Sequence, residues 1–314
     1  MSKPIAIAIH GGAGTIERHL LSPELEKEYL EALSNALKTG EGILKAQGAA
    51  LDAVEAAVKS LEDCPLFNAG KGAVFTHDKT NELDASIMCG ATLNAGSVAA
   101  VRRVRNPIGL ARAIMEKSNH VMLHGVGAQQ FAHEKGLEIM EDSYFYSQFR
   151  YDQLMHVIDE ENAYLDHSPE PKFPDDKKFG TVGAVALDVH GNVAAATSTG
   201  GMTNKRYGRI GDSPVIGSGT YANNLTCAVS CTGHGEYFLR AVVAYDVSCL
   251  MEYKGLSLKE AADFVIHKKL VRLGGEGGLI AVNAMGDIVL PFNSAGMYRG
   301  WANGIESQVA IYKD

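Results

Sequence analysis

The chain has 314 residues, and its 29 Lys and Arg against 37 Asp and Glu leave a net charge of −8 when His is neutral. A hydrophobic share of 46% can supply a large core, and the acidic balance argues against a nucleic-acid surface. No apolar run approaches the roughly 20 residues of a membrane span, and the start shows no signal-type segment. The five cysteines form no CxxC pair, which favours reduced thiols and a cytoplasmic protein.

The first half of the chain is predicted to combine helices with a group of short strands. Apolar periodicity and turn residues separate the elements. In chain order we expect a strand at 5–9 that ends in a glycine turn at 10–14, helices at 23–46 and 49–61, a meander of strands at 73–76, 83–88 and 97–104, a helix at 107–117, a strand at 121–124 and a helix at 127–135.

The segment 159–178 differs in composition from the rest of the chain. Its 20 residues include seven acidic side chains, three basic side chains and three of the nine prolines, with few large apolar groups. Such a segment cannot bury enough apolar surface to fold by itself. We therefore expect a flexible linker that leads to Gly180.

A strong hairpin signal follows the linker. Apolar runs at 181–187 and 193–199 flank a turn at His190-Gly191. Thr181 and Thr199 are equidistant from position 190, so an antiparallel ladder places them on or near opposite rungs. Beyond the hairpin we expect a strand ending at 231, helices at 236–253 and 257–268, and a closing hairpin at 279–282 and 288–292. Clustered strands and paired helices favour an α+β fold of two packed sheets with helices outside.

The glycine turn His10–Gly14 is the first candidate ligand site. Backbone N–H groups in such turns bind anions, although neither a GxGxxG nor a GxxxxGK[ST] pattern is present. A non-enzymatic anion- or nucleotide-binding module therefore stays open as an alternative. The sequence has no HExxH zinc motif and no GxSxG nucleophile elbow.

Motifs along nearly the whole chain resemble those of the plant-type L-asparaginases, or isoaspartyl peptidases, of the N-terminal-nucleophile hydrolases. The resemblance rests on the combination rather than on any single motif. The matching stretches are 10–14, 66–70, Gly180–Asp188, Ala196–Lys205, Gly208–Pro214, Cys231–Glu236, Phe292-Asn293 and Gly296–Arg299.

The resemblance implies a single domain over 1–314 with a four-layer αββα sandwich, made as a precursor that cleaves its own Gly180–Thr181 bond. Cleavage would give an α subunit of residues 1–180, with 159–180 as its flexible tail, and a β subunit of residues 181–314. Relatives assemble as (αβ)2, a pair of such heterodimers. Thr181 would become the nucleophile, and its new α-amine, with a reference pKa of about 7.7–8.0, would act as its base.

The resemblance also implies the partners of Thr181. Thr199 would hydrogen-bond the nucleophile, while the Thr232 hydroxyl and the Gly233 N–H would form the oxyanion hole. One further set of residues would bind the substrate: Arg209 its α-carboxylate, Asp212 and the Gly235 carbonyl its α-ammonium, and Asn68 as a polar neighbour. The implied substrates are L-asparagine and β-aspartyl dipeptides.

The resemblance implies no cofactor for catalysis, but it implies ion sites away from the catalytic residues. A loop in relatives binds a structural sodium ion through main-chain carbonyls, and here it would comprise Leu61, Glu62, Cys64, Phe67, Ala69 and Lys71. Some relatives respond to potassium through a loop that corresponds to Lys117–His120. Glycosylasparaginase is an alternative enzyme with the same nucleophile logic, but here Gly rather than Asp precedes Thr181, and the cysteine count is odd.

Overall fold

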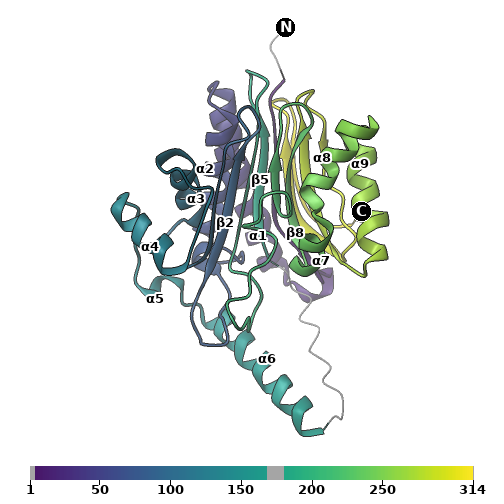
Figure 1. The fold of residues 1–314 in the computed structure, drawn as a ribbon. Helices are drawn as coiled ribbons and strands as arrows, with labels where there is room; N and C mark the ends of the chain where they lie inside the picture. The colour runs from purple at the N-terminus through teal and green to yellow at the C-terminus, as the bar shows by residue number, and fades with distance from the viewer. Residues whose placement is uncertain (1–3, 168–179, 314) are drawn as a thin grey trace.

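The computed structural model describes residues 4–167 and 180–313 and shows two β-sheets packed face to face between layers of helices (Figure 1). Helices α1 to α4 lie on one side of the sandwich and α7 to α9 on the other. The predicted four-layer α+β architecture is therefore confirmed. Within the described residues, no helix is both long and apolar enough to cross a membrane.

The large sheet has eight strands, which are antiparallel to their neighbours except for the parallel pair β3 and β4. In spatial order they are β12 (Ser307–Tyr312), β11 (Gly296–Ala302), β1 (Ala6–Gly14), β5 (Val182–Leu187), β6 (Val193–Thr199), β2 (Leu83–Cys89), β3 (Ala95–Val101) and β4 (Met122–His124). The small sheet has the order β10 (Ile288–Val289), β9 (Gly277–Asn283), β8 (Cys227–Gly233) and β7 (Thr220–Ala222).

The helices cover the outer faces of both sheets. On the side of the large sheet they are α1 (Pro23–Lys45), α2 (Ala50–Glu62), α3 (Pro107–Lys117) and α4 (Gly125–Glu134), followed in the chain by α5 (Asp142–Phe145) and α6 (Gln148–His167). On the side of the small sheet they are α7 (Gly235–Ala241), α8 (Val243–Lys254) and α9 (Leu258–Phe264), which a π-helical turn, Val265–Leu270, continues.

Alternation along the central strands explains why both faces of the large sheet are buried. In β1, Ile7 and Ile9 belong to the core beneath α1 and α2, whereas Ala6 and Ala8 belong to the core between the sheets. Successive strand side chains point to opposite faces, so a strand buried on both faces is apolar without interruption. This burial holds β1, β5 and β6 rigidly at the centre of the sandwich.

Several predicted elements differ from the structure. The strand at 5–9 continues through the glycine run to Gly14, with a register shift between His10 and Gly12 instead of a turn. Residues 73–76 form no strand. The predicted helix at 236–253 is broken at Val242, whose φ of 51° is left-handed. The hairpin at 279–292 does not close the fold, because β11 and β12 follow it and extend the large sheet past β1.

The predicted linker also needs a partial correction. Residues 159–167 are the end of helix α6, which points away from the sandwich in Figure 1. The composition of this segment argues against a folded structure. A helix, however, pairs its backbone N–H and C=O groups within itself and can form with little burial against the rest of the protein. Residues 168–179 of the predicted tail lie outside the described residues.

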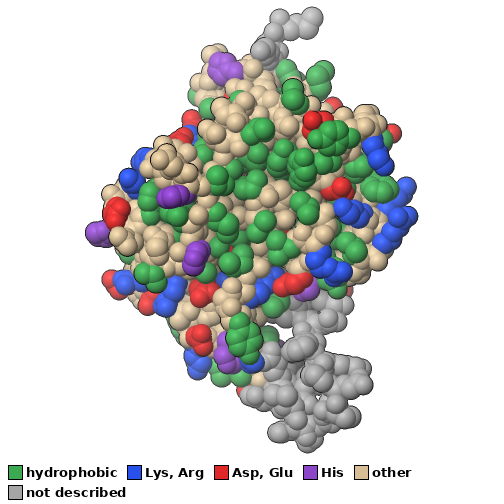
Figure 2. Space-filling view, in the orientation of Figure 1, with side chains coloured by type: hydrophobic (Ala, Val, Ile, Leu, Met, Phe, Trp, Pro, Cys, Tyr) green, Lys and Arg blue, Asp and Glu red, His purple; other side chains and the backbone are tan. Residues whose placement is uncertain are grey.

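The surface carries scattered large apolar side chains. Figure 2 shows hydrophobic side chains gathered near the middle of one face, with charged side chains more frequent toward its rim. Among the exposed apolar residues are Val121 and Met122, at the edge strand β4, and Tyr245 of α8. Apolar side chains exposed singly are normal on a protein surface, whereas a contiguous group of them is typical of a protein contact.

Candidate active site

Thr181 and Thr199 meet where β5 begins and β6 ends. Val182 pairs with Ser198 in the ladder, so the next rung sets the two threonines opposite each other, as the hairpin predicts. The Thr181 hydroxyl donates to Thr199 Oγ1 at 3.2 Å, and the Thr199 hydroxyl donates to the Gly180 carbonyl oxygen at 3.0 Å. The backbone N–H of Gly201 also donates to Thr199 Oγ1 at 3.0 Å. A hydroxyl pair thus joins the predicted nucleophile to the carbonyl of the bond before it.

His10 holds the backbone of Thr181 from the neighbouring strand. Its Nδ1 lies 2.9 Å from the Thr181 carbonyl oxygen and its Nε2 lies 2.9 Å from Ser230 Oγ. Burial lowers the pKa of His10 to about 3, so the ring is neutral at pH 7. A carbonyl only accepts, so the ring proton is on Nδ1 and the Ser230 hydroxyl donates to Nε2. Gly183 makes this contact sterically possible, because a Cβ there would lie 2.0 Å from Ser230 Oγ.

A buried run of hydroxyl groups continues from Ser230 between the two sheets. Ser230 Oγ lies 2.7 Å from Thr197 Oγ1, Thr197 contacts Thr220, and Ser86 Oγ lies 2.7 Å from Thr220 Oγ1. At the far end Ser86 Oγ also lies 2.6 Å from the carbonyl oxygen of Ser213. These polar contacts tie the strand of the nucleophile to the loop that carries Asp212.

Asp212 presents a buried carboxyl group to the site. The residue is 4% exposed, and in the described part of the chain its Oδ2 has no hydrogen-bond partner. Burial raises the pKa of this carboxyl to about 7, and the positive charge of Arg209 offsets only part of that shift. A buried carboxylate oxygen without a partner is costly to ionise, and an ammonium group placed against it would supply the missing charge and hydrogen bond.

Arg209 lies beside Asp212 and forms a two-pronged ion pair that sequence reasoning missed. Its Nε and Nη2 each donate at 2.8 Å to the carboxylate of Glu236. Burial by itself would lower the pKa of Arg209, but the bonds and charge of Glu236 outweigh it and raise the pKa. One edge of the guanidinium is therefore occupied, and the Nη1 group lies beside Gly211.

Most of the predicted catalytic and substrate-binding residues line one small cavity of about 20 Å³, little more than the room of one water molecule. The predicted residues in its wall are Gly180, Thr181, Thr199, Arg209, Asp212, Gly233 and Gly235. A Cβ at Gly235 would lie 2.8 Å from Arg209 Nη2, so a side chain there would displace the guanidinium. Thr232 is fully buried next to Gly233, and its Oγ1 accepts from the N–H of Ala13 at 3.2 Å, which leaves the hydroxyl proton available for donation.

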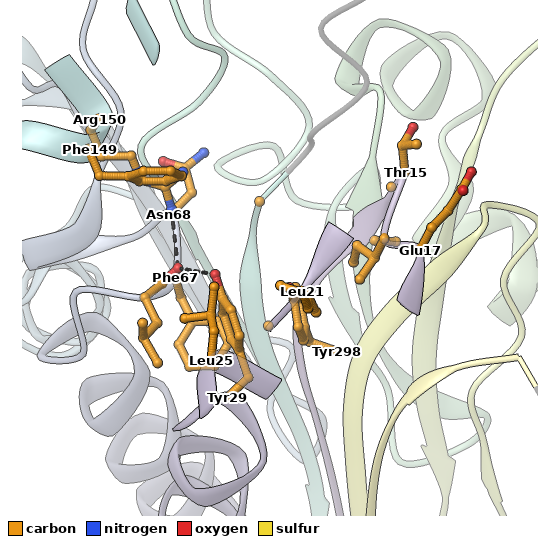
Figure 3. A pocket seen from close by; sticks show the side chains of 16 residues that line it. Thr15, Glu17, Leu21, Leu25, Tyr29, Phe67, Asn68, Phe149, Arg150 and Tyr298 are labelled. Atoms are coloured by element: carbon orange, nitrogen blue, oxygen red, sulfur yellow. Dashed lines mark hydrogen bonds between the residues drawn. The ribbon is translucent and has the colours of Figure 1, made fainter. Parts of the chain in front are cut away.

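Asn68 is positioned differently from the other predicted residues. Its Nδ2 donates to the Gly201 carbonyl at 2.7 Å, and its Oδ1 accepts from the N–H of Val74 at 2.9 Å. Its Cβ also packs so closely on Gly180 that a Cβ at Gly180 would lie 2.5 Å away. Asn68 thus braces the backbone around the Gly180–Thr181 bond and lies in the wall of a second, larger cavity, which Gly180 also lines (Figure 3).

The predicted sodium loop is a series of tight turns at the end of α2. The Phe67 carbonyl accepts from the N–H of Ala69 at 3.0 Å, and the Ala69 carbonyl accepts from Gly72 at 3.1 Å. Each carbonyl oxygen has a second lone pair, so a backbone-coordinated ion fits the chemistry of this loop. Within residues 4–167 and 180–313 there is no group of three or more His, Cys, Asp or Glu side chains able to hold a metal.

Sequence reasoning missed His10 as a partner of Thr181 and Glu236 as a partner of Arg209. The His10 contact spans 171 positions, and nothing in the local pattern of an apolar strand followed by glycines reveals it. Glu236 had a local signal, because it directly follows Gly235 in the quoted motif and an acidic residue is the common partner of a buried arginine.

Comparisons with known proteins agree with the geometry. The family model described as "Asparaginase" matches residues 2–311. The isoaspartyl peptidase of Escherichia coli is 54% identical over 98% of this chain and 96% of its own length, and that of Salmonella typhimurium is 53% identical over the full length of both. A probable isoaspartyl peptidase/L-asparaginase of Arabidopsis thaliana is 42% identical over 95% of each chain. The chain therefore belongs to the asparaginase family of N-terminal-nucleophile hydrolases.

Proposed function

We propose that the protein is an isoaspartyl peptidase/L-asparaginase that cleaves its own Gly180–Thr181 bond to become active. The observation that carries the proposal is the hydroxyl pair, in which Thr181 donates to Thr199 and Thr199 donates to the Gly180 carbonyl. Thr181 Oγ attacks the Gly180 carbonyl carbon, its proton moves to Thr199, and the Thr199 proton moves to the carbonyl oxygen. The carbonyl then re-forms as the C–N bond breaks, the proton of its hydroxyl passes to the leaving nitrogen, and water hydrolyses the resulting ester.

Cleavage provides the base for the second reaction. The freed α-amine of Thr181, with a reference pKa of about 7.7–8.0, accepts the hydroxyl proton as Oγ attacks the side-chain carbonyl of the substrate. The Thr232 hydroxyl and the Gly233 N–H stabilise the oxyanion, a contribution typically worth about 2.7–4 kcal/mol per donor. Ammonia or an amino acid leaves with a proton, and water releases aspartate from the acyl-enzyme.

The substrate is an L-aspartyl unit with a free amino-acid end. The unpartnered Oδ2 of Asp212 and the Gly235 carbonyl bind the α-ammonium, and the Arg209 guanidinium binds the α-carboxylate. The bound aspartyl unit of the substrate then presents its β-carbonyl carbon to the Thr181 hydroxyl. L-Asparagine and β-aspartyl dipeptides share this unit and differ only in the leaving group.

The remaining parts of the proposal concern bound ions, assembly and cellular location rather than the reaction. The turn that carries the carbonyls of Phe67 and Ala69 would hold a structural sodium ion, and the loop Lys117–His120 is the candidate for a response to potassium. Two αβ heterodimers would associate through exposed apolar surface of the kind seen in Figure 2. All five cysteines are free thiols, which supports a reducing, cytoplasmic setting.

Denaturing electrophoresis with N-terminal sequencing tests the proposal. The purified protein should separate into chains of 180 and 134 residues, the second beginning at Thr181, and should release aspartate from asparagine and from β-aspartyl-leucine. Thr181→Ala should remain intact, whereas Thr181→Ser, which keeps a hydroxyl, should still cleave. An active chain that is never cleaved would contradict the proposal. Preferred hydrolysis of glycosylated asparagine would indicate a glycosylasparaginase, and nucleotide binding without amidase activity an anion-binding module.

A further inference from the structure

Lys205 is buried against the turn that follows Thr199. Its side chain is 1% exposed, and it is the only buried lysine of residues 4–167 and 180–313. A lysine is rarely buried unless its ammonium group is paired, because the buried charge loses its hydration. The proposed reaction does not use this side chain, so its burial beside the site requires another reason.

Two acidic residues near the start of β2 hold the ammonium group of Lys205. Its Nζ donates to the Glu82 carbonyl oxygen at 3.2 Å and lies 3.6 Å from the Glu82 carboxylate. Asp84 is fully buried, its Oδ1 accepts from the N–H of Ala100 at 2.7 Å, and within the described chain its Oδ2 has no hydrogen-bond partner. Burial raises the pKa of Asp84, and the positive charge of Lys205 is the strongest influence that opposes this rise. The ammonium group is therefore attracted to Asp84.

The register of the large sheet relates these charges to Thr199. Asp84 of β2 pairs with Thr199 of β6. Paired residues of neighbouring strands point to the same face of a sheet, so the Asp84 carboxyl lies on the face that carries the Thr199 hydroxyl. The chain turns back after Thr199 and brings Lys205 to this face.

The hydrocarbon part of the Lys205 side chain packs against Gly201. A Cβ at Gly201 would lie 3.1 Å from both Cδ and Nζ of Lys205, and the φ of +82° at this position also favours glycine. The carbonyl of Gly201 accepts from Asn68 Nδ2 at 2.7 Å. With its carbonyl bonded and its Cα packed, Gly201 is held in an orientation in which its N–H donates to Thr199 Oγ1 at 3.0 Å.

The Gly201 N–H decides where the proton of Thr199 points. A hydroxyl oxygen has one proton and two lone pairs. The Thr181 hydroxyl and the Gly201 N–H take the two lone pairs, and the third neighbour, the Gly180 carbonyl oxygen, can only accept. The proton of Thr199 is therefore directed at Gly180, as the proposed self-cleavage requires. Without the Gly201 N–H, the hydroxyl could rotate and direct its proton away from that carbonyl.

We propose that Lys205 is a positioning residue for self-cleavage, which holds the Gly201 N–H on Thr199 and so fixes the direction of proton transfer from Thr181 through Thr199 to the Gly180 carbonyl. The inference rests on the proposed function and adds to it a residue that does not line the substrate cavity. Glu82 and Asp84 anchor the ammonium group and thereby the whole side chain.

A double-mutant cycle with Thr199 tests this role, because a residue that acts through the Thr199 hydroxyl has no effect once that hydroxyl is removed. Lys205→Ala should slow cleavage by about 3- to 10-fold in the native background, the size of one neutral hydrogen bond. In the Thr199→Val background it should slow cleavage by less than about twofold. Half-times are measured on denaturing gels from the time of synthesis, with Lys259→Ala, at an exposed position of α9, as control.

Each variant is first checked for cooperative unfolding in urea, because Lys205 is buried and its removal leaves Glu82 and Asp84 without this partner. If Lys205→Ala does not fold, Lys205→Met replaces it in the cycle. Methionine keeps most of the side chain beside Gly201 but cannot donate to Glu82, so the slowing should be smaller and again confined to the native background.

The outcomes separate this inference from the proposed function. Equal slowing in the two backgrounds would show that Lys205 acts on the fold in general and not through Thr199. That result, or a native cleavage rate in the Lys205 variants, would overturn the inference and leave the proposed function intact. A native chain that is never cleaved would overturn the proposed function itself.

Discussion

The imidazole of His10 and the backbone carbonyl of Thr181 lie 2.9 Å apart in the centre of the large sheet. This contact links the middle of β1 to the residue that directly precedes β5, on the side of Thr181 away from the Gly180 carbonyl. The neutral ring can hold Thr181 in place without competing for its hydroxyl proton. His10 is therefore a positioning residue, and its effects should appear in maturation.

Replacing His10 with phenylalanine should slow the cleavage of the Gly180–Thr181 bond and lower stability. The apolar ring removes the donor to the buried Thr181 carbonyl, at about 1–3 kcal/mol, and leaves the Ser230 hydroxyl with Thr197 as its partner. His10→Asn keeps one donor and should lose less of both. Urea unfolding and the half-time of cleavage on gels measure the two effects, with His133→Ala at an exposed position of α4 as control. Cleavage of His10→Phe at the native rate would contradict the positioning role.

Thr199→Val should slow self-cleavage by about 10²- to 10³-fold, because it removes the donor to the Gly180 carbonyl, where negative charge develops during attack. Valine keeps the shape and the strand preference of threonine, so the fold should persist with a modest loss of stability, because the Gly201 N–H loses this acceptor. Thr199→Ser keeps the hydroxyl and should cleave at a rate within about tenfold of native, which makes it the matched control. Similar cleavage half-times for the valine and serine variants would exclude the hydroxyl pair from the reaction.

Arg209→Lys should raise KM for asparagine by about 10- to 100-fold and leave self-cleavage intact. Lysine keeps the charge but loses the planar fork that Glu236 now holds in place through two bonds of 2.8 Å. Glu236→Gln should cause a smaller rise, because it weakens the brace and not the ligand contact itself. Steady-state kinetics on the cleaved enzymes provide the measurement, with Arg112→Lys on α3 as control. An unchanged KM in Arg209→Lys would remove this residue from substrate binding.

The sequence predicted the hairpin that carries Thr181 and Thr199 because a two-residue period and a turn signal are local. It also predicted α1 to within one residue, since Ser22 caps a long amphipathic pattern. It did not predict β11 and β12. β11 pairs with β1, almost 300 positions away along the chain, and pairing at that separation leaves no mark in either segment, while β12 pairs with β11 at the edge of the sheet.

The candidate site likewise contains residues that were predicted from the sequence and residues that were not. The resemblance supplied the residues that line the small cavity, whereas His10 and Glu236 act through contacts that only the folded chain brings together. The sequence shows where the glycines are, but it does not show which neighbouring atoms leave no room for a side chain at each of them. A Cβ at Gly183 would lie 2.0 Å from Ser230 Oγ, and a Cβ at Gly235 would displace the Arg209 guanidinium, 2.8 Å away, from its place in the site.

Substrate binding should weaken as the pH falls below about 7, because the ammonium group of the ligand requires Asp212 to be ionised. Burial raises the pKa of this carboxyl to about 7, so more than half of the free enzyme is protonated at lower pH. The dissociation constant of L-aspartate, measured by calorimetry on the cleaved enzyme, should rise up to about tenfold per pH unit below 7. Binding of this product does not require the Thr181 amine as a base, so the measurement isolates Asp212.

Asp212→Asn should bind L-aspartate weakly, and its dissociation constant should not depend on pH in this way.

The raised pKa of Asp212 also changes how the stability of the protein depends on pH. The folded pKa lies above the unfolded value, so the native state binds the proton more tightly and Asp212 contributes less stability as pH rises from about 4 to 7. Asp212→Asn should therefore gain unfolding free energy relative to the native protein across that window. A pH-independent dissociation constant in the native enzyme would show that Asp212 is ionised throughout and that Arg209 outweighs its burial.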